Sequence, residues 1–144
     1  MGEKEAITDA GYVATMKGMV AAMGYAWKDV AFSNICGERN SAKPPTEAEM
    51  AIALPAFKQK VARLQPRAII VLGEVAALGL LGNRDIAALR QRPHTFEGLP
   101  AIPTYHPAYL NKFGNAVKAD ACRDLRKALL RIGRPVPAVL ERFK

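Results

Sequence analysis

Apolar and polar positions along the chain form two kinds of pattern, one with helical spacing and one of short apolar runs. Residues 8–24 carry apolar side chains every three or four positions, which predicts a helix. Residues 29–35 and 99–104 form short apolar runs that predict strands. Residues 67–73 are apolar almost without interruption, which favours a central strand of a parallel sheet that is covered on both faces.

Between these runs the pattern predicts further helices. Thr46 and Glu49 have the spacing of a capping box, so a helix is expected from there to about residue 64, with a bend at Pro55. Residues 116–132 are strongly amphipathic, with an apolar face and a basic face. Shorter helices are expected at 74–81, 85–89, 109–113 and within the tail, residues 135–144.

The remaining segments are expected to be irregular: residues 36–45 form a loop rich in breakers, and residues 90–97 are basic. Strands that alternate with helices predict a single α/β domain over residues 1–144, a three-layer sandwich with helices on both sides of a parallel sheet. Ligands of such sheets bind beyond the carboxyl ends of the strands. This rule gathers residues 34–39, 73–75 and 106–110 in one crevice.

Charge adds to this picture. The chain has 144 residues, of which half are hydrophobic, with 21 Lys and Arg against 13 acidic residues, a net charge of +8. The sequence pI is about 9.8. A basic domain of this kind favours polyanionic partners such as DNA, RNA or acidic lipid, because binding releases their counterions.

The cysteines and the lengths of the apolar runs indicate in which compartment the protein works and whether it binds a metal or a membrane. Cys36 and Cys122 are far apart and belong to no metal-binding motif, which predicts free thiols, a cytoplasmic protein and no zinc or iron–sulfur cofactor. No apolar run reaches the length of a membrane span, so no membrane association is expected. The first residues include both acidic and basic side chains, and no apolar run follows them, so they do not resemble a secretory signal.

The segment Thr-Tyr-His-Pro-Ala-Tyr-Leu at residues 104–110 is the strongest candidate for a functional site. An apolar strand leads into it and a helical segment follows, so His106 is expected at a tight turn between two rigid elements. Pro107 fixes its own φ and disfavours the α region for His106, which partly sets the direction of the imidazole. The structural alternative is a surface histidine before a helix-starting proline.

With these segments in order, the chain resembles the uracil-DNA glycosylase superfamily, nearest its thermostable, iron–sulfur-containing branch. The resemblance runs from about residue 11 to residue 132, and its most specific block is the histidine motif. The matching segments are residues 33–35, 45–47, 64–73, 76–82, 89–90 and 98–110. The resemblance implies the family's α/β fold and cleavage of the bond between uracil and deoxyribose in base-excision repair, on a base flipped out of the DNA.

The resemblance also implies roles for single residues. Asn34 matches the asparagine that reads the base, since one amide offers a donor and an acceptor to uracil. From the sequence pattern alone, Asn34 would only end a strand. His106 matches the histidine that stabilises the negative charge on the departing uracil. DNA contacts are expected from Arg39, Gly73, Pro107, Tyr109, Leu110 and Lys112.

Two departures from the family pattern alter these expectations. The family's first loop, a Gly-Glu-Ala-Pro-Gly-like segment that positions water, has only a faint echo in Gly2-Glu3, so an N-terminally shortened domain is expected. No residues match the four cluster cysteines, so no cluster is expected. Three hypotheses follow: a minimal glycosylase, a catalytically degenerate DNA-binding subunit, or an interaction module whose exposed sheet edge is covered by a protein partner or a second copy.

Overall fold

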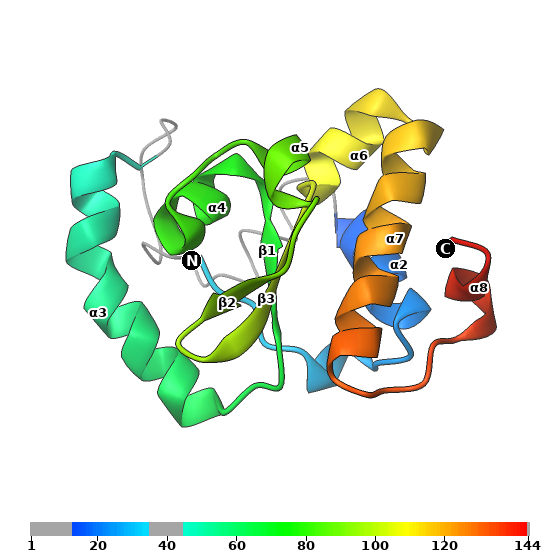
Figure 1. Ribbon diagram of the computed structural model, residues 1–144, viewed down its shortest axis with the longest axis horizontal. Coiled ribbons are helices and arrows are strands. Elements are labelled where there is room, and N and C mark those ends of the chain that lie inside the picture. Colours follow the sequence, from blue (N-terminus) through cyan, green and yellow to red (C-terminus); the bar gives the residue numbers. More distant parts are fainter. Residues whose placement is uncertain (1–12, 35–44, 144) are drawn as a thin grey trace.

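The computed structural model describes residues 13–34 and 45–143 (Figure 1). Helix α2 (Val13–Ala22) comes first and confirms the helical spacing there. A 3-10 turn, η1 (Trp27–Asp29), follows, and residues 31–34 are in no strand, so the strand expected over 29–35 is wrong where it is described. The reason is local packing. The centroids of the Trp27 and Phe32 rings are 4.6 Å apart, so the apolar side chains of this segment pack on each other and not in the sheet.

The long helix α3 (Glu47–Leu64) begins as its sequence predicts. Thr46 caps it, because its hydroxyl accepts from the Glu49 N–H while the Glu49 carboxylate accepts from the Thr46 N–H, each at 3.1 Å. Pro55 lies inside this helix, and Gln65 ends it with a φ of 49°.

The sheet has three strands among the described residues, in the order β1-β3-β2. Strand β1 (Ile69–Leu72) pairs in parallel with β3 (Leu99–Thr104), as the α/β prediction requires. The central position, however, belongs to β3 and not to β1. Strand β2 (His94–Phe96) pairs antiparallel with β3, in a segment that was expected to be irregular. A two-residue turn with φ of 51° at Glu97 and 79° at Gly98 makes this hairpin possible.

Two prolines occupy the central strand at positions where no hydrogen bond is lost. Pro100 lies opposite Thr95, so this must be a non-hydrogen-bonded pair, because proline has no N–H to donate. By the same alternation, the nitrogen of Pro103 faces the β2 side. Strand β2 has already ended at that point, since its pairing stops with His94 opposite Ala101. Both prolines therefore fit a strand that is paired on each side over only part of its length.

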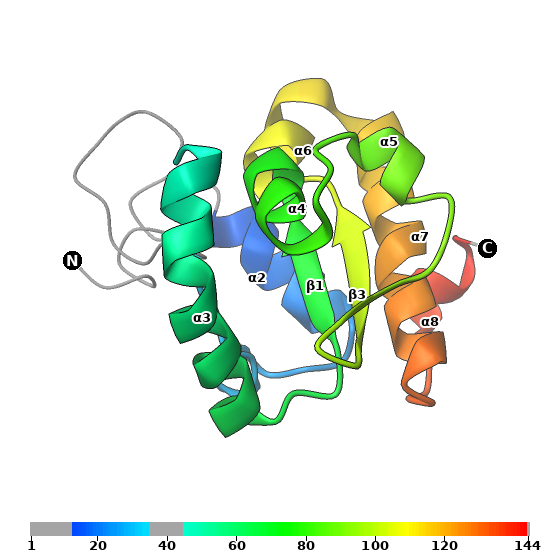
Figure 2. The ribbon, with the colours of Figure 1, turned by 60° about the vertical axis from the view of Figure 1, so that its left-hand side comes forward.

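Helices cover the sheet on two sides, which gives a three-layer α/β arrangement (Figure 2). On one side, α3 and α4 (Gly73–Leu81) share a buried cluster with the sheet and with α5 (Ile86–Leu89), which includes Val61, Val71 and Ala77. On the other side, α7 (Asn115–Arg131) packs on β3. The tail helix α8 (Ala138–Glu141) adds Leu140 to a cluster with Leu125 and Leu129 of α7, against which side chains of α2 pack.

One further helix, α6 (Pro107–Phe113), connects β3 to α7. Its first residue is Pro107, two residues before the helical segment that was expected from residue 109. In residues 13–34 and 45–143, no helix has both the length and the apolar character needed to cross a membrane.

Candidate functional site

The carboxyl ends of β1 and β3 lie side by side and place Gly73 against His106. Leu72 is in register with Thr104, so the residues after each strand emerge at the same edge of the sheet. A Cβ atom added to Gly73 would lie 3.0 Å from the Cβ of His106, and Gly73 has a φ of 86°. The missing side chain of Gly73 therefore makes room for the histidine.

His106 is the N-cap of α6, and its backbone is extended, as expected before a proline (φ −63°, ψ 142°). Its Nδ1 accepts a hydrogen bond from the Ala108 N–H at 3.1 Å. An accepting Nδ1 carries no proton, so the neutral ring has its proton on Nε2, which is a donor. Burial lowers the pKa of His106, and this favours the same neutral form.

The other residues of the motif divide into buried and exposed ones. Pro107 is buried, and Leu110 is only 2% exposed, so its side chain packs beneath α6. Because this side chain lies in the core here, the DNA contact expected of Leu110 stays a prediction. Tyr109 and Lys112 are exposed.

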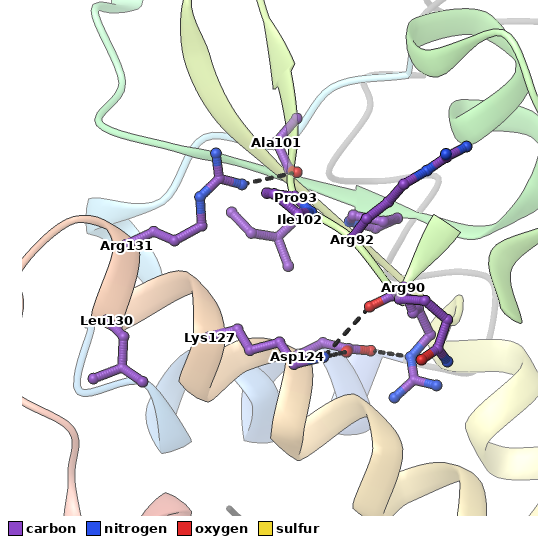
Figure 3. Close-up of a pocket in the computed structure, with 11 residues that line it drawn as sticks. Arg90, Arg92, Pro93, Ala101, Ile102, Asp124, Lys127, Leu130 and Arg131 are labelled. Atoms are coloured by element: carbon purple, nitrogen blue, oxygen red, sulfur yellow. Dashed lines mark hydrogen bonds and ion pairs between the residues drawn. The ribbon is translucent and has the colours of Figure 1, made fainter. Parts of the chain in front are cut away.

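A buried ionic network lies directly behind this turn and was not expected from the sequence. Asp124 of α7 accepts from the Arg90 Nε at 2.6 Å (Figure 3). It also accepts from the Thr104 hydroxyl at 2.6 Å. Asp124 is 1% exposed and Thr104 is fully buried. Arg90 also donates to the Asp120 carbonyl at 3.2 Å. The network fixes the end of β3 to α7, immediately before Tyr105 and His106.

The groups of this network have shifted pKa values. Burial raises the pKa of Asp124, against the opposing effect of the hydrogen bonds from Arg90 and Thr104. Burial alone would lower the pKa of Arg90, but the contacts with Asp124 and Asp120 together raise it. The sequence did hold one signal for this network: Asp124 is a charged residue on the apolar face of its helix, beside Ala121 and Leu125.

A cavity of about 330 Å³ lies between β3 and α7, and Arg90 and Asp124 of the network are part of its lining. Cationic side chains line it, and Figure 3 shows two of them bonded within it: Lys127 donates to the Arg90 carbonyl and Arg131 to that of Ala101, each at 3.4 Å. His106 is not part of its lining. This cavity is therefore distinct from the crevice expected at the strand ends.

Asn34 is exposed and lies in a segment without regular secondary structure. The neighbouring residue, Ser33, accepts a hydrogen bond of 3.1 Å from the Lys60 Nζ of α3. This hydrogen bond joins the segment to α3, and the described contacts of His106 include Gly73 and α6. The convergence of Asn34 and His106 thus stays a prediction, and Arg39 lies outside the described residues.

The described part of the chain contains no cluster of three or more His, Cys, Asp or Glu side chains suited to a metal ion. Cys122 is a half-buried free thiol whose pKa is raised by burial. Cys36 lies outside the described residues.

The fold and the turn together define an α/β domain that presents a histidine where a parallel strand meets a short helix. The family model of the uracil DNA glycosylase superfamily matches residues 7–129. The chain therefore belongs to this superfamily. No curated protein matches the chain.

Proposed function

We propose that this protein is a uracil-DNA glycosylase that flips uracil out of DNA and hydrolyses its N-glycosidic bond, with His106 and Asn34 as the catalytic residues. The observation that supports this most strongly is the hydrogen bond from the Ala108 N–H to the His106 Nδ1. It leaves Nε2–H as a donor at a turn whose two flanks are rigid. Such a fixed donor is what a developing anion requires.

In the proposed reaction the bond between uracil N1 and the sugar C1′ breaks, and its electron pair stays with the base. The negative charge accumulates largely on O2, where the His106 Nε2–H stabilises it. A water oxygen then bonds to C1′, which has become cation-like, and the water loses a proton to solvent, while the uracil anion takes up a proton at N1 from solvent. The products are free uracil and an abasic site.

Asn34 has the role of selecting the base. Its amide donates one hydrogen bond and accepts another, which matches the neighbouring carbonyl and N–H on the Watson–Crick edge of uracil. Cytosine presents the reverse order, and because an amide can turn over to match it, the selectivity requires a neighbouring group that holds the Asn34 amide in one orientation. Arg39, Gly73, Pro107, Tyr109 and Lys112 would hold the DNA around the flipped base.

A uracil-release assay tests the proposal. A duplex with one uracil is incubated with the protein, and abasic sites are detected by strand cleavage in alkali. Removing one preorganised donor to a developing anion costs about 100- to 1,000-fold in rate, so His106→Ala should lose at least that much. Asn34→Ala should lose selectivity for uracil as well as rate.

Two variants serve as matched controls. His94→Gln replaces the other histidine, whose Nε2 lies 2.7 Å from the Leu89 carbonyl, and should leave uracil release unchanged. Asn115→Ala removes an exposed asparagine at the start of α7. Uracil release that survives both His106→Ala and Asn34→Ala would refute the assignment. DNA binding that falls steeply with salt, without any cleavage, would instead support the catalytically degenerate alternative.

A further inference from the structure

Three aromatic rings form a continuous stack that begins beside His106 and runs along α6. The Tyr105 and Tyr109 rings are stacked, with centroids 5.1 Å apart and an interplanar angle of 12°. The Phe113 ring follows, 4.3 Å from that of Tyr109 and tilted by 36°. Tyr109 and Phe113 are four residues apart and so lie on one face of the helix.

The two ends of this stack differ in their surroundings. At the inner end, the Arg90 guanidinium lies 5.3 Å from the Tyr105 ring and is itself held by the buried Asp124. At the outer end, Phe113 is 52% exposed and Tyr109 is 42% exposed. The Lys112 Nζ lies over the Phe113 ring, 5.3 Å from its centroid. The stack is thus anchored in the core and ends in an exposed ring beside a cation.

An exposed ring face with a cation beside it matches the chemistry of a nucleotide. The base supplies a π-face that stacks on an aromatic ring, and the phosphate supplies an anion for the lysine. A protein partner fits less well, because a stable interface buries about 800 Å² on each side and two rings provide much less. The net charge of +8 also favours a polyanion.

We propose that Tyr109, Phe113 and Lys112 form a stacking platform for an unpaired nucleobase, which gives the protein a preference for single-stranded or mispaired DNA. A base within a duplex is already stacked on both faces, so it gains little from Phe113, whereas an unpaired base has a free face. Leu110 is buried, so the two rings are the large apolar groups that α6 presents to solvent. This proposal depends on the proposed function in one respect only: the glycosylase reaction is what would place the DNA strand beside a flipped uracil.

Fluorescence anisotropy with uracil-free DNA tests the platform without any catalysis. A labelled thymine single strand and a fully paired duplex of the same length are titrated with wild-type protein, Phe113→Leu, Phe113→Tyr and Lys112→Gln. Stacking contributes about 1–3 kcal/mol per base, so Phe113→Leu should weaken single-strand binding by roughly 5- to 150-fold. Duplex binding should change much less, and Phe113→Tyr, which keeps the ring, should bind like wild type.

Ile52→Ala is the matched control, because Ile52 is an exposed apolar residue of α3, outside α6. Circular dichroism checks that each variant is folded, which is expected since Phe113 is largely exposed. Single-strand binding that is unchanged in Phe113→Leu, or lost equally for both DNAs, would overturn the platform. The two proposals fail separately: a protein that binds single strands through Phe113 but releases no uracil would refute the glycosylase and keep the platform.

Discussion

At the level of single residues, the direction of His106 is set by its own helix. The Nδ1 of His106 caps α6 by accepting from the Ala108 N–H, and it cannot carry a proton while it does so. The helix cap therefore also fixes the tautomer, with the ring proton on Nε2. A proton on Nδ1 would place a second donor against the Ala108 N–H and a positive charge at the start of a helix. This geometry adds to burial in disfavouring the imidazolium.

The pKa of His106 should therefore be measurably below the ordinary histidine value of about 6.5, as read from its ring protons by NMR. Because the folded pKa is lowered, the unfolded chain binds more protons at mildly acidic pH. The stability that this group contributes is complete above about pH 6.5 and is lost as the pH falls through the folded pKa. His106→Asn, whose side chain can still cap α6, should remove this part of the pH dependence, and a pKa at or above 6.5 would contradict the argument.

Gly73 and Gly82 offer a test of why the first must be a glycine. Both have positive φ, 86° and 75°, and they begin and follow the same helix, α4. Alanine at either should cost about 1–2 kcal/mol of unfolding free energy from backbone strain. Only Gly73→Ala also meets His106, so it should be the less stable variant in urea and should lose uracil release. Equal stability and equal activity of the two variants would show that the contact does not matter.

At the level of elements, the buried pair of Arg90 and Asp124 connects the end of α5 to α7, and Thr104 joins β3 to the same carboxylate. Asp124→Ala would leave the guanidinium of Arg90, whose side chain is 9% exposed, without its buried partner. Breaking one side of a buried pair typically costs about 3–5 kcal/mol.

Chemical denaturation of Asp124→Ala should show this loss, while Glu141→Ala serves as the control. Glu141 pairs with Arg126 at 4.0 Å and its side chain is half exposed, so its removal should cost at most about 1 kcal/mol. A loss below that value for Asp124→Ala would mean that Arg90 finds water or another partner easily.

Across the whole molecule, sequence patterns located the features that local chemistry determines. The capping box at Thr46, the apolar run around Val71 and the amphipathic pattern of α7 each arise within one segment. Strand β2 was not predicted because it has only three residues, which is too short for a clear pattern. It also depends on a hairpin turn in which Glu97 has a positive φ. The segment around Phe32 looked like a strand because its apolar side chains pack on Trp27, which is a tertiary contact.

The same division applies to the candidate site. His106 stood out because Pro107 and the apolar run before it constrain the turn locally. The Arg90–Asp124 pair joins residues 34 positions apart, and Leu110 is buried only because α6 packs with that face inward. The periodicity of α7 places Asp124 on the apolar face, but it cannot identify Arg90 as the partner or show which face of α6 is buried, since each depends on how two elements meet.

The placement of prolines in β3 has a consequence for how the protein behaves at high concentration. Among the described residues no strand pairs with the β2 side of β3 beyond Ala101, yet Pro103 and Thr104 are buried there. An open sheet margin normally invites a foreign strand and so fibre growth. Here burial covers the unpaired margin and Pro103 has no N–H to offer, so we expect this margin to resist the addition of a foreign strand.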